Sequence, residues 1–274
     1  MLTRVLHVSD LHVGRRESVE AHDALVRLSE RLQPELVIAS GDLADRGRRD
    51  QHDLAAELLR ALDRPLLAVP GNHDIPYRFP ARFTQPWAEF ERVWGTTEPV
   101  HSGERLVVVG LNSVRPWRHQ SGRLADAQLA RADRLFGEAP EGALRVAVLH
   151  HHLLGAPWRS RKRPIARRNH VLGRLVASGA ELVLAGHIHQ SAVAERREFE
   201  VSSADGEPAV VVSIAPGLGQ PRPRRLGEAL GVHVYDADDT TLTARTFIWR
   251  DEGWGLTAVR TYPRGRQPLP FEPE

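Results

Sequence analysis

The chain has 274 residues, which is enough to bury a sizeable core in one large α/β domain or in two small ones. Its 41% hydrophobic and 26% charged residues are ordinary for a soluble globular protein, and the absence of cysteine excludes disulfides and thiolate metal sites. The net charge of +2 gives no argument for a nucleic-acid partner, and no apolar run approaches the roughly 20 residues that a membrane span needs.

The first two-thirds of the chain alternates short apolar runs with helical patterns. The runs predict buried strands at 5–8, 36–39, 66–69, 107–109, 146–149 and 182–185. Amphipathic helices are predicted between them, around Leu25/Leu28/Leu32, Leu54/Leu58/Leu59/Leu62, Leu129/Leu135/Phe136 and Val171/Leu172/Leu175/Val176. Continuous apolar runs separated by amphipathic helices favour parallel strands that are covered on both faces.

The pattern changes after Ser191. Strands are predicted near 192–201, 209–214, 230–235, 241–249 and 256–262, with turns such as Asp205-Gly206 between some of them and no obvious helix. We expect this half to add a mostly antiparallel second sheet to a parallel or mixed first sheet. The expected organisation is one α/β domain over residues 1–262, with a proline-rich tail over 263–274.

Five histidine- and aspartate-bearing motifs each follow one of the apolar runs. They read Ser9-Asp10-Leu11-His12, Gly41-Asp42-Leu43-Ala44-Asp45, Gly71-Asn72-His73-Asp74, Leu149-His150-His151-His152 and Gly186-His187-Ile188-His189. Ligands of open α/β sheets bind beyond the carboxyl ends of the strands, so the five motifs are expected to meet at one rim. In an extended chain, residues two apart point the same way, which would aim Asp10 with His12, and His187 with His189, at one centre. Gly41, Gly71 and Gly186 are expected where strand turns sharply into loop.

Carboxylate, imidazole and amide groups together suit divalent Mn, Fe or Zn. Two such ions carry four positive charges, of which two aspartates neutralise two, and the remaining charge favours hydroxide together with a phosphate oxyanion. The motif set therefore predicts two metal ions per chain and attack of a metal-bridging hydroxide at phosphorus.

The five motifs, in this order, resemble the calcineurin-like metallophosphoesterases, whose pattern is D-x-H, G-D-x-x-D, G-N-H-[DE], H and G-H-x-H. The match extends from Asp10 to His189. The resemblance implies a two-sheet β-sandwich flanked by helices in four layers, αββα. Within the family, the motifs most resemble those of bacterial class III cyclic-nucleotide phosphodiesterases.

The resemblance also implies roles for individual residues. One metal would be held by Asp10, His12 and His189, the other by Asn72, His150 and His187, and Asp42 would bridge them. His73 would donate to the phosphate or leaving group as a catalytic residue, with Asp74 orienting it through a hydrogen bond, and Asn72 would also face the substrate. In the fourth motif His150 is the preferred ligand, with His151 the next choice and His152 assigned to packing or support.

Several other residues have two interpretations each. Asp45 is interpreted as structural rather than as a ligand. The basic segment Arg159–Arg163 with Arg167 and Arg168, which holds the chain's only lysine, Lys162, is interpreted as a solvated loop, with a cationic flap over an anionic substrate as the alternative. Trp117 and Trp158 are assigned to packing, with base stacking as the alternative.

The expected function is that of a phosphodiesterase acting on a small phosphorylated substrate, with cyclic AMP as a named candidate. A phosphomonoesterase, a DNA nuclease of the SbcD type and a non-catalytic scaffold on the same fold are the alternatives. The nuclease is disfavoured because such proteins carry DNA-binding regions for which this sequence has little length. The first motif begins at Ser9, which leaves no room for a signal peptide ahead of the fold, so a cytoplasmic location is expected. The oligomeric state stays open, and a homodimer is among the states that fit.

Overall fold

A computed structural model of the chain describes residues 2–14, 19–118, 120–156, 162–197, 209–219, 228–250 and 252–264. The helices are α1 (Val19–Leu32), α2 (Arg49–Arg60), α3 (Ala81–Thr84), α4 (Ala88–Trp94), α5 (Asp126–Gly137) and α6 (Arg168–Ala177). The strands are β1 (Thr3–Val8), β2 (Leu36–Ala39), β3 (Leu66–Ala68), β4 (Val100–Ser102), β5 (Leu106–Gly110), β6 (Leu144–Val148), β7 (Leu182–Ala185), β8 (Ala192–Arg197), β9 (Ala209–Ile214), β10 (Gly231–Ala237), β11 (Thr241–Arg250) and β12 (Gly253–Pro263).

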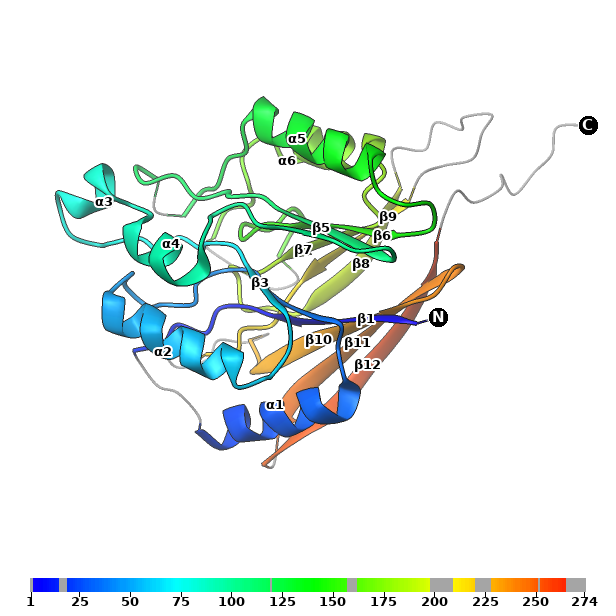
Figure 1. Cartoon of the computed structure of the whole chain (residues 1–274), viewed down its shortest axis with the longest axis horizontal. Coiled ribbons are helices and arrows are strands. Elements are labelled where there is room, and N and C mark those ends of the chain that lie inside the picture. The colour runs from blue at the N-terminus through cyan, green and yellow to red at the C-terminus, as the bar shows by residue number, and fades with distance from the viewer. Residues whose placement is uncertain are drawn as a thin grey trace, which may run out of the picture.

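The strands form two six-stranded mixed sheets, which lie face to face between layers of helices (Figure 1). One sheet has the order β12-β11-β10-β1-β2-β3, in which β1, β2 and β3 are parallel and the other pairs are antiparallel. The other has the order β4-β5-β6-β7-β9-β8, in which β5, β6, β7 and β9 are parallel. The prediction of a two-sheet sandwich flanked by helices is confirmed.

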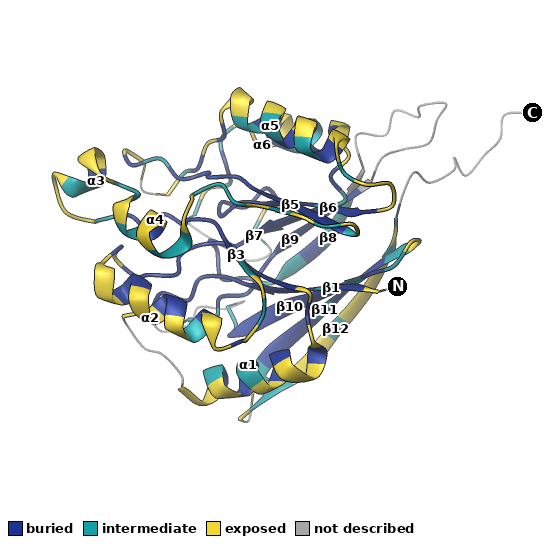
Figure 2. Ribbon diagram, in the orientation of Figure 1, coloured by how far each residue is buried: buried dark blue, intermediate teal, exposed yellow. Residues whose placement is uncertain are grey.

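Alternate residues of a single strand enter different cores, which explains why the strands read as unbroken apolar runs. In β2, Leu36 and Ile38 face the core between the two sheets, whereas Val37 and Ala39 face the core under α1 and α2. In β7, Leu182 and Leu184 enter the core between the sheets. Burial of both faces leaves the exposed surface mainly on the outer sides of the helices (Figure 2).

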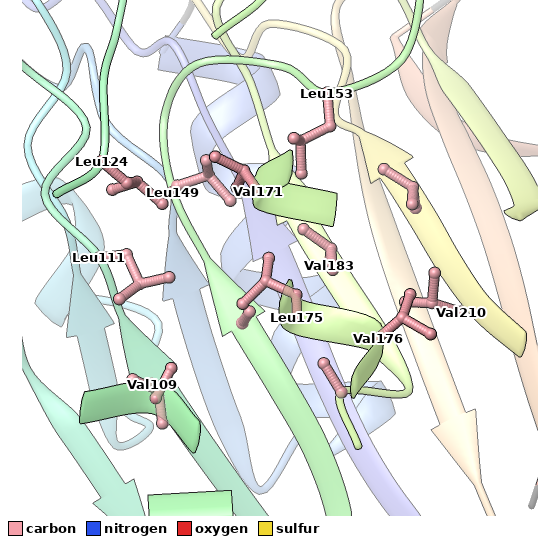
Figure 3. Packing of buried hydrophobic residues seen from close by; sticks show 14 of the residues in the cluster. Val109, Leu111, Leu124, Leu149, Leu153, Val171, Leu175, Val176, Val183 and Val210 are labelled. Carbon is pink, nitrogen blue, oxygen red and sulfur yellow. The ribbon is translucent and has the colours of Figure 1, made fainter. Parts of the chain in front are cut away.

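A third core lies between the second sheet and helices α5 and α6. Figure 3 shows Val183 of β7 and Leu149, which follows β6, close to Val171 and Leu175 of α6. Three separate cores between four layers are the packing that an αββα architecture requires.

The allocation of strands to sheets differs from the expectation. The last three strands do not build a second sheet of their own but extend the sheet of β1, β2 and β3, because β10 pairs antiparallel with β1. The prediction that Leu54 lies on the buried face of α2 is also wrong, because this side chain is 38% exposed. The short elements α3, α4 and β4 were not predicted.

Some sequence-based expectations fall on parts of the chain that are not described. The Asp205-Gly206 turn, the end of the strand predicted near 192–201 and most of the tail at 263–274 lie outside the described residues. The division into one domain and a tail stays a prediction. Among the described helices, none is long and apolar enough to cross a membrane.

Candidate metal centre

The five motifs follow β1, β2, β3, β6 and β7, so they come from both sheets and lie beyond the carboxyl ends of parallel strands. The loops after these strands are hydrogen-bonded to one another. The amide of Asp10 donates to the Gly41 carbonyl at 2.9 Å, and the amide of His12 donates to the Asp42 carbonyl at 2.9 Å. The amide of His187 donates to the Asp10 carboxylate at 2.9 Å, which ties the two sheets together at this rim.

Five of the motif residues have left-handed backbone conformations, with φ of 54° at Asp10, 49° at His12, 53° at Asp42, 78° at His187 and 58° at His189. Such conformations are uncommon outside glycine and persist where the surrounding structure imposes them. The sequence argument from extended chain is therefore wrong in its geometry. Asp10 and His12 do share one group of candidate ligands, whereas His187 and His189 belong to two different groups.

Glycines at the rim have two different functions. Gly41 has φ of 93°, a conformation that favours glycine, and it agrees with the sharp turn predicted at this position. Gly71 and Gly186 are needed for close approach instead. A Cβ at Gly71 would overlap the Asp42 amide, and one at Gly186 would overlap the Ser9 hydroxyl.

The two carboxylate oxygens of Asp10 differ: one accepts hydrogen bonds from the protein, and the other faces the candidate ligands. Its Oδ2 accepts hydrogen bonds from the Ser9 hydroxyl at 2.7 Å and the His187 amide at 2.9 Å. Its Oδ1 is buried without a hydrogen bond and lies 3.1 Å from Nε2 of His189 and 3.8 Å from Nε2 of His12. These three side chains form one group of candidate ligands.

The two carboxylate oxygens of Asp42 differ in the same way. Its Oδ1 accepts a hydrogen bond from the His73 amide at 2.8 Å. Its Oδ2 is buried without a hydrogen bond, 3.7 Å from Nε2 of His12 and 3.3 Å from Nε2 of His150. One free oxygen therefore faces both sides of the centre.

A second group consists of Asp42, His150 and His187. Nδ1 of His150 donates to the Ser40 carbonyl at 2.8 Å, so Nε2 is turned toward Nδ1 of His187 at 3.1 Å. His151 instead bonds the Ser113 hydroxyl through Nδ1 at 2.8 Å. The geometry thus brings the first histidine of the fourth motif to Asp42, and the second faces Ser113.

The donor set fits divalent cations. The buried atoms Oδ1 of Asp10, Oδ2 of Asp42 and Oδ1 of Asn72 have no hydrogen-bond partner, although buried polar atoms are normally satisfied. All three are hard oxygen acceptors beside imidazoles, and cations at this point would satisfy them. His12, Asp42 and His73 form a further group of the same compactness, among the described residues, so the ion-binding role of His73 needs a direct test.

The protonation states of His12, His187 and Asp42 suit metal ligands, whereas that of His150 does not. Burial lowers the pKa of His12 and of His187 well below the ordinary value, which favours the neutral imidazoles that bind metals. Burial opposes ionisation of Asp42, but the imidazoles of His150 and His73 lower its pKa well below the usual range. Against the effect of burial, the Asp42 carboxylate raises the pKa of His150 to about 9, so a cation there would compete with a proton.

His73 lies at the open side of the centre, with its side chain 23% exposed. Its ring meets the ring of His12 edge to face, with centroids 4.7 Å apart. Nδ1 donates to the Asp45 carbonyl at 2.8 Å, which leaves Nε2 on the open side, where it accepts from a substrate as the neutral ring and donates to one as the imidazolium. The Tyr77 hydroxyl lies 3.0 Å from Nδ1, and this neighbour was not predicted because no motif surrounds it.

Asp74 does not form the expected hydrogen bond with His73. Its two carboxylate oxygens accept from the backbone amides of Ala44 and Gly71, each at 2.7 Å. Burial, together with the charge of Asp42, raises the pKa of Asp74 to about 7. The side chain therefore joins the loops after β2 and β3.

Replacing Asp74 by asparagine should destabilise the fold. An amide nitrogen would face one of the two backbone N–H groups, and an unsatisfied buried donor costs about 1–3 kcal/mol. Urea unfolding at equal metal loading measures this loss. Asp238→Asn is a matched control, because Asp238 also accepts two backbone amides, those of Thr240 and Thr241, but on a surface turn. Unchanged stability with lost turnover would show that Asp74 acts in the chemistry.

Other expectations for single residues have mixed outcomes. Lys162 is half-buried, and its ammonium donates to the His187 carbonyl and lies 3.5 Å from Nε2 of His189. The solvated-loop interpretation is therefore wrong at that residue. The packing interpretation is wrong for Trp117, which is 70% exposed. Arg159 to Arg161 and Trp158 lie outside the described residues.

Asp45 is buried, and its carbonyl holds His73 while its carboxylate lies 3.3 Å from Nε of Arg46. These contacts agree with a structural role. His152 is also buried, and its ring stacks on that of His187 with centroids 5.7 Å apart, which supports the packing assignment.

Comparison with known sequences identifies the family. Residues 3–191 match the family model described as Calcineurin-like phosphoesterase, which covers more than half of the chain. The chain belongs to this family of metal-dependent phosphoester hydrolases, as the five motifs indicated.

Three known proteins illustrate the similarity. The chain is 24% identical over 227 residues to the 3',5'-cyclic adenosine monophosphate phosphodiesterase CpdA of Haemophilus influenzae, covering 78% of each chain. It is 30% identical over 251 residues to a cAMP/cGMP dual specificity phosphodiesterase of Mycobacterium tuberculosis, covering 84% of this chain and 76% of the relative. The structure of a purple acid phosphatase from yellow lupin (Lupinus luteus) superposes with a TM-score of 0.68 at 10% identity, over 95% of this chain and 53% of that one, and shares the fold.

Proposed function

We propose that the protein is a dinuclear metal-dependent phosphodiesterase that hydrolyses a small phosphodiester, with cyclic nucleotides such as cyclic AMP as the candidate substrates. The observation that carries the proposal is the free Oδ2 of Asp42, which lies 3.7 Å from Nε2 of His12 and 3.3 Å from Nε2 of His150. A carboxylate oxygen shared between two ligand groups is what a pair of ions needs in order to sit close together.

The residues divide into two ligand sets. Asp10, His12 and His189 would hold one ion, and Asn72, His150 and His187 the other, with Asp42 common to both. Such ions, when bound, activate water as a nucleophile at neutral pH and stabilise negative charge on a phosphoryl group. The metal pair, Mn, Fe or Zn, is left open by this mixture of nitrogen and oxygen donors.

The protein groups outside the ligand sets have their own part in the reaction. As the imidazolium, with Nδ1 donating to the Asp45 carbonyl, His73 can transfer its second proton from Nε2 to the leaving oxygen and become the neutral ring. Asn72, next to it in the chain, can both ligate and face the substrate. The Lys162 ammonium, beside His189, adds a positive charge on the side where a phosphate anion would bind.

The cyclic-nucleotide assignment is supported by relatives over most of the chain. The proteins from H. influenzae and M. tuberculosis are named as cyclic-nucleotide phosphodiesterases, and each similarity spans more than three-quarters of this sequence. The alternatives are a phosphomonoesterase, a DNA nuclease and a scaffold, and all of them share the same fold.

The test combines elemental analysis of protein purified without chelator with a substrate panel. We expect about two metal ions per chain, and turnover of bis-p-nitrophenyl phosphate in excess of p-nitrophenyl phosphate with added manganese. Cyclic nucleotides should then be preferred over glycerophosphodiesters. Equal rates on all diesters would remove cyclic nucleotides, monoester turnover alone would indicate a phosphatase, cleavage of DNA would favour the nuclease, and absence of metal would refute the proposal.

A further inference from the structure

A cavity of about 310 Å³ lies outside the metal centre, where the chain enters α5. It is lined by Arg115, Trp117, Arg118, Arg123, Ala125 and Asp126. Binding sites for small molecules begin at about 300 Å³, so the cavity is large enough for one compact organic ligand. None of its lining residues belongs to the metal-ligand sets.

Two of the charged residues on its wall are already engaged. Nη1 of Arg115 donates to the carbonyls of Asn112 and Val114, and Nη2 donates to the Gln128 side chain at 2.9 Å. Arg115 is therefore a fixed part of the wall. The only carboxylate in the lining, that of Asp126, lies 3.0 Å from the His170 imidazole and 3.5 Å from the Arg167 guanidinium.

Arg118 and Arg123 differ from Arg115. Within the part of the chain that the structure describes, neither guanidinium has an ion pair or a side-chain hydrogen bond. Two such guanidiniums in the lining, with the carboxylate of Asp126 paired to other cations, make the cavity positive. Guanidinium groups bind phosphate oxygens with paired, charge-assisted hydrogen bonds.

The aromatic group of the lining is the Trp117 indole. It is 70% exposed, and among the described side chains no aromatic ring lies against it. An indole of this kind contributes little to the core of the protein. It offers an open aromatic face on which a flat heterocycle can stack.

The cavity wall is connected to the metal centre through one loop. The Arg123 amide donates to the Ser113 carbonyl at 2.9 Å, and the Ser113 hydroxyl bonds Nδ1 of His151 at 2.8 Å. The His151 ring in turn lies against the ring of His187, with centroids 4.7 Å apart. A ligand in the cavity would therefore contact the loop that holds Ser113, whose hydroxyl bonds His151 beside the proposed metal ligand His187.

We propose that this cavity is a nucleotide-binding site separate from the metal centre, in which the base stacks on Trp117 and the phosphate is held by Arg118 and Arg123. A nucleotide combines the planar ring and the anionic group that these side chains recognise. The inference goes beyond the proposed hydrolysis and does not depend on it, because binding is measured without turnover.

The experiment is calorimetric titration of the metal-loaded full-length protein with 5'-AMP, and separately with inorganic phosphate. The variants are Trp117→Ala and a double variant, Arg118→Ala with Arg123→Ala. Arg134→Ala, an exposed arginine of α5 that does not line the cavity, is the matched control. Metal content and thermal unfolding of each variant report whether the fold is intact.

We expect each of the cavity variants to weaken AMP binding by about tenfold or more, the range for one stacked base or one charge-assisted pair. The control should stay within about twofold of the parent protein. Inorganic phosphate should bind more weakly than AMP. AMP affinity that is unchanged in either cavity variant, or phosphate binding as tight as that of AMP, would overturn the proposal, whatever the hydrolysis assays show.

Discussion

Replacement of Asp42 by asparagine should abolish metal-dependent turnover. The carboxylate is fully buried, its Oδ1 is fixed by the His73 amide, and its free Oδ2 faces His12 and His150. Asparagine keeps the size but loses the negative charge that two cations would share. Loss of residues that only support a metal ligand costs 10–100-fold, so loss of a shared ligand should reduce kcat/KM by at least about 100-fold.

Elemental analysis and diester hydrolysis of the same preparation measure this effect, and metal content should fall together with the rate. Asp50→Asn is the control, because Asp50 lies on α2 with a side chain that is 70% exposed and, among the described residues, pairs with Arg48 alone, at 3.1 Å. A variant at Asp42 that retained full metal content and rate would exclude the shared-ligand role. Full biological effect without turnover would instead favour the scaffold.

The second large effect is expected for His73→Ala, which should lower kcat by about 10²–10⁴-fold while leaving the metal content nearly intact. Its imidazole is the partly exposed member of the site, and it is fixed by the Asp45 carbonyl rather than by a carboxylate of the ligand sets. The variant would remove the proposed proton donor of the leaving group. Single-turnover kinetics and elemental analysis on one preparation separate the two functions.

A control for this variant is His101→Ala, because His101 is a half-buried histidine of β4 outside the five motifs. The test is needed because His12, Asp42 and His73 lie close enough together to hold an ion themselves. If His73→Ala loses an ion, His73 is a ligand and the proton-donor role is wrong. A leaving group of low pKa, such as p-nitrophenolate, should be less affected than an alcohol.

The position of the site was predictable because local signals define it. Each motif follows an apolar run that could only be a strand buried on both faces, and parallel strands end at the same rim. The pairing of strands was not predictable in the same way. Whether β10 joins β1 or forms a sheet of its own depends on contacts between residues 232 positions apart, such as Arg4 with Asp236, which no local pattern contains.

The finer geometry of the site escaped the sequence for related reasons. The spacing of Asp10 and His12 indicated a shared direction, but not the left-handed backbone that produces it. The family resemblance implied that Asp74 orients His73, yet its carboxylate accepts hydrogen bonds from amides of two loops. Trp117 was assigned to packing because most tryptophans are buried, and nothing in the flanking residues shows that it lines a cavity.

The left-handed conformations at Asp10, His12, Asp42, His187 and His189 have a consequence for ion exchange. Hydrogen bonds between the loops hold these backbones in place in the folded protein. The loops therefore lose their conformational entropy when the protein folds, rather than when an ion binds. A preorganised cradle of this kind can release one divalent ion and accept another without rearranging its loops. Which metal occupies it in the cell is then decided by supply more than by the protein's shape.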